Sequence, residues 1–82
     1  LDHLQQWLSE CCEQVEGYWT ANHLLYQSYE NWCEANGVTP KKERQFGRGL
    51  SHKGLQTGQK QRVQGKEFRG VIGLKLLETP PY

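Results

Sequence analysis

The sequence lacks several features that mark large classes of protein. It contains no methionine, no apolar run longer than five residues and only three cysteines in 82 residues. A membrane-spanning helix needs about 20 predominantly apolar residues, so runs this short exclude one. No basic segment is followed by an apolar one in the manner of a secretory signal. Because the first residue is Leu1 and not methionine, we expect a piece excised from a longer protein.

Positive charge is missing from the first 37 residues, which contain six acidic side chains and no lysine or arginine. Residues 38–82 hold ten lysines and arginines against three glutamates, so a net charge of +1 conceals halves of −6 and +7. One interpretation is that the two halves neutralise each other across the fold. The other is that the basic half presents a strong positive field to a polyanion. The clustering of the cations at particular spacings favours the second interpretation.

The composition, with 35% hydrophobic and 23% charged residues, is that of a folded domain and not of a disordered segment. The length predicts a single domain over residues 1–82, with no room for a second core. No phosphate-binding glycine loop, H-E-x-x-H motif or carboxylate pair near a histidine is present. We therefore expect the domain itself not to be an enzyme.

The cysteines and histidines do not have the spacing of disulfides or metal ligands. An odd number of cysteines, two of them adjacent and none in a C-x-x-C pair, argues against both disulfides and structural zinc. We expect reduced thiols, an intracellular location, and neither a metal nor another cofactor. The residues concerned are Cys11, Cys12, Cys33, His3, His23 and His52.

Two amphipathic helices are predicted in the acidic half. The first covers residues 1–15, where apolar side chains recur every three or four residues, and it ends at Gly17. A short extended segment, Tyr18–Trp19, and an N-cap at Thr20 precede the second helix over residues 21–35. The inner stripe of the second helix is Ala21, Leu25, Tyr29, Trp32 and Cys33, and Asn36-Gly37 ends it.

A third helix is predicted over residues 40–52, with Thr39 as its cap and Pro40 in its first turn. At about 100° per residue, its inward side is limited to Phe46 and Leu50. The opposite side bears no acidic residue, although an ordinary solvated helix face mixes glutamate with lysine. That outer side carries Lys41, Arg44, Gln45, Arg48, Ser51 and His52.

Side chains of these types read base edges in the major groove of DNA. Arginine pairs with guanine, glutamine pairs with adenine, and lysine and serine contact either bases or phosphates. The outer side of the third helix therefore predicts a DNA-reading surface, and a solvated face remains the alternative. About six cations on phosphates would give a slope near −5 for log K against log salt.

The chain after Gly54 predicts two strands, at about residues 55–59 and 68–77, with a polar, glycine-bounded loop between them. Gly70 and Gly73 indicate bulges or a close approach to a helix, and Pro80-Pro81 ends the ordered chain. The cations of the loop and its edges could contact phosphates or the minor groove, although a solvated hairpin tip is also rich in lysine. They are Lys60, Arg62, Lys66 and Arg69.

The predicted order of helix, short strand, helix, helix and hairpin is that of an α+β winged helix. In this fold the third helix enters the major groove and the hairpin, or wing, lies on adjacent backbone. We expect the cations of the third helix and of the wing to lie on the same side of the domain.

A longer motif begins at Leu25 and reads L-Y-Q-S-Y-E-N-W-C-E-A-N-G up to Gly37. It is followed by Pro40, Phe46-Gly47-Arg48, Leu50, Gly54 and Arg69-Gly70-x-x-Gly73-Leu74. Over residues 18–74 the chain resembles the C-terminal winged-helix domain of phage and plasmid primase–helicases, a family that includes poxvirus-type replicative helicases. It is most similar to the origin-binding domains of enterobacterial satellite phages.

The resemblance implies a module that binds double-stranded DNA at the repeats of a replication origin and recruits a primase–helicase. The implied partners are origin DNA, helicase and primase domains in the same chain, and further copies of the chain, in the cytoplasm of a bacterial host. It implies framework roles for Tyr29, Trp32, Phe46 and Leu50, a helix cap at Gly37 and a DNA contact at Arg48.

Two other functions remain open on the sequence. A winged helix can also serve as a protein-interaction or dimerisation module, for which the acidic half would supply a surface. A binder of RNA or single strands would need exposed aromatic rings for stacking, whereas most aromatic residues here lie in or beside predicted core stripes.

Overall fold

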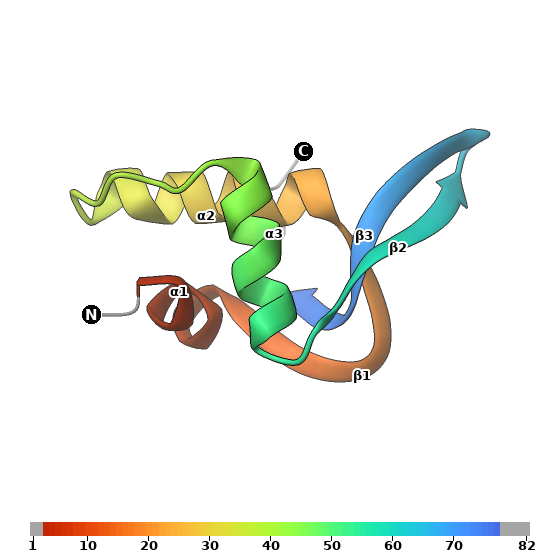
Figure 1. Cartoon of the computed structure of the whole chain (residues 1–82), viewed down its shortest axis with the longest axis horizontal. Coiled ribbons are helices and arrows are strands. Elements are labelled where there is room, and N and C mark those ends of the chain that lie inside the picture. The colour runs from red at the N-terminus through yellow and green to blue at the C-terminus, as the bar shows by residue number, and fades with distance from the viewer. Residues whose placement is uncertain (1–2, 78–82) are drawn as a thin grey trace.

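The computed structural model describes residues 3–77, which form three helices and one sheet (Figure 1). A strand follows the first helix directly, and the other two strands form a hairpin at the end of the chain. The elements in order are α1 (His3–Cys11), β1 (Cys12–Ala21), α2 (Asn22–Ala35), α3 (Glu43–His52), β2 (Gln56–Val63) and β3 (Lys66–Leu76). The fold is α+β and is compatible with a winged helix.

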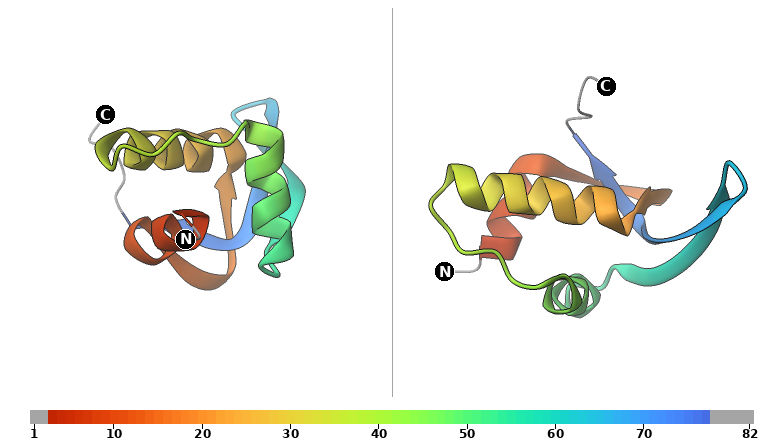
Figure 2. Two further views of the ribbon diagram at one scale, coloured as in Figure 1. Left: turned by 60° about the vertical axis from the view of Figure 1, so that its left-hand side comes forward. Right: turned by 90° about the horizontal axis from the view of Figure 1, so that it is seen from above.

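The sheet is antiparallel, with the strand order β1-β3-β2 and β3 in the centre. β1 pairs with β3 only from Gly70 onward, whereas β2 accompanies β3 as far as Lys66. The outer end of the β2–β3 hairpin is therefore two-stranded. Figures 1 and 2 show this end extending away from the helices.

The core lies where the three helices meet each other and the sheet. Phe46 of α3 is at its centre, with ring centroids 4.9 Å from Tyr29 and 5.4 Å from Trp7. Leu50 is completely buried one helical turn later, and β3 closes the core with Val71 and Leu74. Phe46 and Leu50 are the buried residues of α3, which confirms the narrow inward side predicted for this helix.

The first helix is shorter than predicted. It ends at Cys11, and the residues that were expected to continue it to residue 15 belong to the ten-residue strand β1. The expected strand at Tyr18–Trp19 is only the last part of β1. Cys12 pairs with Leu76 of β3, and this long-range pairing overrides the local helical period. Gly17 does not end a helix; it lies in β1 at φ +77, inside the register shift.

Thr20 is not a helix cap. It lies in β1, where its buried hydroxyl donates a 2.6 Å hydrogen bond to the carbonyl oxygen of Leu74. The N-cap position of α2 belongs to Ala21, which makes no side-chain capping bond. The cap prediction was wrong because the Thr20 hydroxyl bonds to Leu74 of β3, which lies too far along the chain to be seen in a local window of sequence.

The third helix begins at Glu43 with Lys42 in the N-cap position, three residues later than predicted. Thr39 and Pro40 therefore do not start it, and Lys41 precedes it. Residues 38–42 have no regular structure. Both backbone groups of Lys41 bond to tyrosine hydroxyls of α2, which satisfies them without a helix.

The polar, glycine-bounded loop expected between the last two strands is instead largely part of the strands themselves. β2 continues to Val63 and β3 starts at Lys66, so the connection is the two-residue turn Gln64-Gly65. Both turn residues have positive φ, 51° and 79°, as a type I′ turn requires. The loop prediction was wrong because a run of polar residues on both faces lacks the alternation by which a strand is recognised.

The second helix agrees with its prediction to within one residue. Its five predicted inner residues are buried, although Ala21 is the last residue of β1 and not part of α2. Gly37 follows it at φ +67, whereas Asn36 stays at φ −106 and is not left-handed. Gly70 marks a close approach, but to a strand and not to a helix: a β-carbon there would lie 2.3 Å from Nε1 of Trp19. Pro80-Pro81 lies outside the described residues.

Candidate nucleic-acid interface

The outer face of α3 is formed by polar residues opposite its buried stripe. Because the helix turns about 100° per residue, Arg48 lies directly opposite the direction midway between Phe46 and Leu50. The other residues of this face lie within about 60° of Arg48. All five are exposed and none is acidic: Arg44, Gln45, Arg48, Ser51 and His52.

The N-terminal end of α3 gathers positive charge where a helix prefers negative charge. Lys41, Lys42 and Arg44 lie beside or in the first turn, and all three are exposed. The partial positive charge of a helix N-terminus repels cations by a few tenths of a kcal/mol each. Glu43 is the acidic residue of this turn, and its carboxylate accepts a hydrogen bond from the Asn22 side chain of α2. An anion bound there would relieve the repulsion.

The cations of the hairpin divide between its two faces. Residues that are directly opposite in an antiparallel pair share a face, and so do alternate residues of one strand. Lys60 pairs with Arg69 and lies two residues from Arg62, so these three share one face. Lys66 pairs with Val63 and lies on the other face. All four cations are exposed, but the structure brings only three of them together.

The three-cation face carries an electrostatic conflict of its own. Lys60 and Arg69 are directly opposed like charges, an arrangement that destabilises a sheet by some tenths of a kcal/mol. Glu67 on the same face compensates in part, with its carboxylate 3.6 Å from the Lys60 ammonium. Both side chains of this pair are more than half exposed, so the pair is weak.

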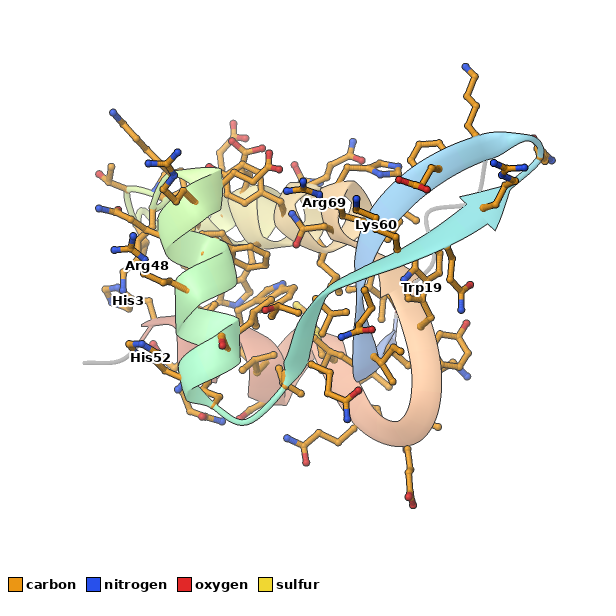
Figure 3. All side chains as sticks on the ribbon, turned by 45° about the vertical axis from the view of Figure 1, so that its right-hand side comes forward. His3, Trp19, Arg48, His52, Lys60 and Arg69 are labelled. Atoms are coloured by element: carbon orange, nitrogen blue, oxygen red, sulfur yellow. The ribbon has the colours of Figure 1, made fainter. Side chains whose placement is uncertain are left out.

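Figure 3 shows how the two groups of cations lie. Arg48 and His52 point outward from α3 on the side away from the hairpin, whereas Lys60 and Arg69 lie next to each other on the hairpin. The cations expected to converge thus form two groups on neighbouring elements and not one continuous cluster. α3 leads into β2 after only residues 53–55, so the groups are joined by a short stretch of chain.

The acidic half of the sequence occupies other elements. Glu10 lies in the last turn of α1, Glu13 and Glu16 lie on β1, and Glu30 and Glu34 lie toward the end of α2, all exposed. The Lys60–Glu67 pair is internal to the hairpin and neutralises none of these acids. This placement favours separate acidic and basic surfaces over mutual neutralisation.

The sequence analysis did not identify three residues that lie in or beside the candidate interface. Lys42 occupies the N-cap position of α3, and its position next to Lys41 was an available signal. Trp19 fixes the base of the hairpin, because its indole donates a 2.9 Å hydrogen bond to the carbonyl oxygen of Gln59. His3 lies on the Arg48 side in Figure 3, where α1 meets α3 through Leu4 and Gly49. Neither Trp19 nor His3 has a local signal, since both depend on contacts distant in sequence.

Burial favours the neutral forms of two tyrosines on α2 and of one cysteine on β1. Burial raises the pKa of Tyr26, and the nearby carboxylates of Glu30 and Glu43 raise it further. Burial also raises the pKa of Tyr29. Burial, together with the adjacent Cys11, raises the pKa of the Cys12 thiol to about 12. The two tyrosine hydroxyls therefore stay protonated at neutral pH, where Tyr26 donates to Lys41 and Tyr29 accepts from it, and Cys12 is not a nucleophile.

Neither a metal site nor a membrane span is found in the part of the chain that the structure describes. Residues 3–77 contain no cluster of three or more histidine, cysteine, aspartate or glutamate side chains suited to a metal ion. None of the three helices within that range is long and apolar enough to cross a membrane. No disulfide joins the three cysteines, all of which lie in the same range.

A family model described as Poxvirus D5 protein-like matches residues 2–68 of the sequence. The chain belongs to this family. The match relates it to D5-type primase–helicase replication proteins. In this D5-like chain the matched residues include all of α3 and β2 and the first residues of β3, and thus the whole outer face of the helix and the hairpin turn. No curated protein matches the sequence.

Proposed function

We propose that this domain is a winged helix that binds double-stranded DNA sequence-specifically at a replication origin and brings a linked primase–helicase to it. The observation that carries the proposal is the outer face of α3. It is exposed and free of acid, and it is centred on Arg48 opposite the buried Phe46 and Leu50. The family supports the replication context, since its members are related to primase–helicases.

In this proposal α3 lies in the major groove and the hairpin lies on the neighbouring backbone. Arg44 and Arg48, one helical turn apart, suit guanine edges, and Gln45 suits adenine. Ser51 and His52 continue the same face toward the end of the helix. Lys60, Arg62 and Arg69 suit phosphates, which position the domain without reading sequence. The two separate groups of cations correspond to these two kinds of contact.

The domain acts without chemistry of its own in this proposal, and catalysis belongs to primase and helicase domains elsewhere in the parent protein. The likeness of residues 18–74 to satellite-phage origin-binding domains supports a bacterial host cell as the site of action. Repeats at an origin would assemble several copies of the domain along the DNA.

Selection of bound sequences from a randomised duplex library tests sequence specificity. We expect one motif to be enriched and to recur as repeats at the replication origin of the genome that encodes the chain. Binding to the enriched duplex and to a scrambled one should differ at least about a thousandfold at about 0.15 M salt. Equal affinities for the two duplexes would contradict the proposal.

Arg48→Gln tests whether α3 is the reading element. A bidentate arginine–guanine contact contributes about 1–3 kcal/mol of discrimination, so the variant should lose about five- to 150-fold in affinity for the enriched duplex and less for the scrambled one. Its melting temperature should stay near that of the wild type, because the side chain is exposed. Glu34→Gln on α2 is the matched control. Tolerance of Arg48→Gln would favour a protein-interaction module instead.

A further inference from the structure

Two tyrosines of α2 form hydrogen bonds with the backbone of Lys41, the first cation of the candidate interface. The Tyr26 hydroxyl donates a 2.6 Å hydrogen bond to the carbonyl oxygen of Lys41. The N–H of the same lysine donates a 3.2 Å hydrogen bond to the Tyr29 hydroxyl. Both backbone groups of one loop residue are therefore bound by side chains three positions apart on one helix face.

The same two rings also pack against α3. Their centroids lie 5.3 Å and 4.9 Å from that of Phe46, for Tyr26 and Tyr29 respectively. Each tyrosine thus has two separable parts: a ring that belongs to the core around α3 and a hydroxyl that reaches the chain just before it. Phenylalanine would keep the first part and remove the second.

The loop that contains Lys41 has little else to fix it. Residues 38–42 have no regular secondary structure, and residues 39–42 are exposed. Val38 is bonded to the end of α2 through the Cys33 carbonyl oxygen, 2.8 Å away. From there to Glu43 the chain crosses from one helix to the next, and the two hydroxyls hold it near the midpoint.

We propose that Tyr26 and Tyr29 are positioning residues for DNA binding, whose hydroxyls hold Lys41 in place to contact a phosphate beside the N-terminus of α3. This inference rests on the proposed function and adds two residues that do not touch the DNA. A cation on a loose loop loses conformational entropy when it binds, whereas a cation whose backbone is already fixed loses less. The raised pKa of Tyr26 keeps its hydroxyl protonated and able to donate to the Lys41 carbonyl oxygen, whereas the Tyr29 hydroxyl accepts its bond from the Lys41 N–H.

The test uses the whole chain with Tyr26→Phe, Lys41→Gln and the double variant. The probe is a short fluorescein-labelled duplex of mixed sequence, titrated at several salt concentrations. Tyr18→Phe is the matched control, because Tyr18 is exposed on β1 and its ring lies near Lys75, away from Lys41. Thermal melting of each variant monitors the fold, which Tyr26→Phe should leave intact because the ring contacts are kept.

Lys41→Gln should weaken binding about fivefold at about 0.15 M salt and reduce the slope of log K against log salt by about 0.9. Tyr26→Phe should weaken binding about two- to fivefold and reduce the slope in the same direction. The double variant should bind no more weakly than Lys41→Gln alone, because the hydroxyl acts through Lys41. A purely structural role for the hydroxyl would change the melting temperature but not the slope.

The outcomes separate this inference from the function on which it rests. Wild-type protein that fails to bind the duplex would overturn both. Wild-type protein that binds, with Tyr26→Phe equal to it in affinity and slope, would overturn the inference alone. Losses that add in the double variant would also overturn it, because Tyr26 would then act independently of Lys41.

Discussion

Arg62 and Lys66 form a matched pair of cations at the tip of the hairpin, one on each of its faces. We predict that Arg62→Gln weakens DNA binding, whereas Lys66→Gln leaves it nearly unchanged. Arg62 shares its face with Lys60 and Arg69, and Lys66 shares its face with Val63 and Phe68. From charge alone the two residues are equivalent, so a difference between them would come from the register of the strands.

The magnitude follows from the release of counterions. One phosphate contact contributes about −0.9 to the slope of log K against log salt. Relative to a 1 M reference, this is about 0.7 log units at about 0.15 M salt, which is about fivefold in affinity or about 1 kcal/mol. Arg62→Gln should therefore bind about fivefold more weakly with a slope smaller by about 0.9, and Lys66→Gln should change either quantity far less.

Fluorescence anisotropy titrations of one duplex across a range of salt concentrations measure both quantities. Thermal melts provide the control for folding, which neither variant should disturb because both side chains are exposed. Equal losses in the two variants, or a larger loss for Lys66→Gln, would refute the assignment of the three-cation face to the DNA.

Three further predictions concern a charge, a packing contact and a buried thiol. Glu67→Gln should strengthen duplex binding by a few-fold in the same titrations, because it removes the acidic side chain from the three-cation face. Weaker binding would contradict this and would show that Glu67 is needed to orient Lys60. In urea unfolding, Gly47→Ala should stabilise the domain by up to about 1 kcal/mol, because its β-carbon would meet open space and alanine favours a helix. Gly49→Ala should be less stable than Gly47→Ala, because its β-carbon would lie 2.5 Å from Leu4 Cδ2 and the buried Leu4 side chain would have to shift. Equal stability of the two variants would contradict this packing of α1 on α3. Burial raises the pKa of the Cys12 thiol to about 12, against 9.0 in the unfolded chain. As the pH rises above 9 the thiol therefore ionises in the unfolded state first, and the free energy of unfolding should fall by about 1 kcal/mol by about pH 10. Cys12→Ala should lack that part of the pH dependence, and an unchanged profile would contradict it.

The sequence predicts those parts of the fold that depend on local chemistry. α2 has both a clear apolar period and a glycine at its end, and its limits are correct to within one residue. α3 shows its two inward residues plainly, because the rest of its surface is polar or glycine. The order of elements also follows in outline, although β1 and the outer part of β2 leave no recognisable local pattern.

The parts that were missed depend on partners far away in sequence. Residues 12–15, expected in the first helix, belong to β1 because β3 pairs with this segment from 50 or more positions further along the chain. Thr20 is bonded to Leu74, at a separation of 54 residues, and no local window contains that partner. The late start of α3 has the same cause, since tyrosines 12 and 15 residues earlier satisfy the backbone of Lys41.

The candidate site was predictable as a list of residues but not as an arrangement. Every predicted site residue proved to be exposed, which the sequence could anticipate from polarity. The division of the hairpin cations into Lys60, Arg62 and Arg69 against Lys66 could not be anticipated, because it depends on the two-residue turn and the resulting register. An error of one residue in that register would have exchanged the faces.

The central claim is that the outer face of α3 contacts duplex DNA. Backbone amide shifts of the isotope-labelled chain, recorded as duplex is added, test it most directly. We predict that the largest shifts occur in Glu43–His52 and in the β2–β3 hairpin, with little change at Glu13 and Glu16 on β1. Shifts that centre on α1 and β1, with α3 unaffected, would contradict the claim.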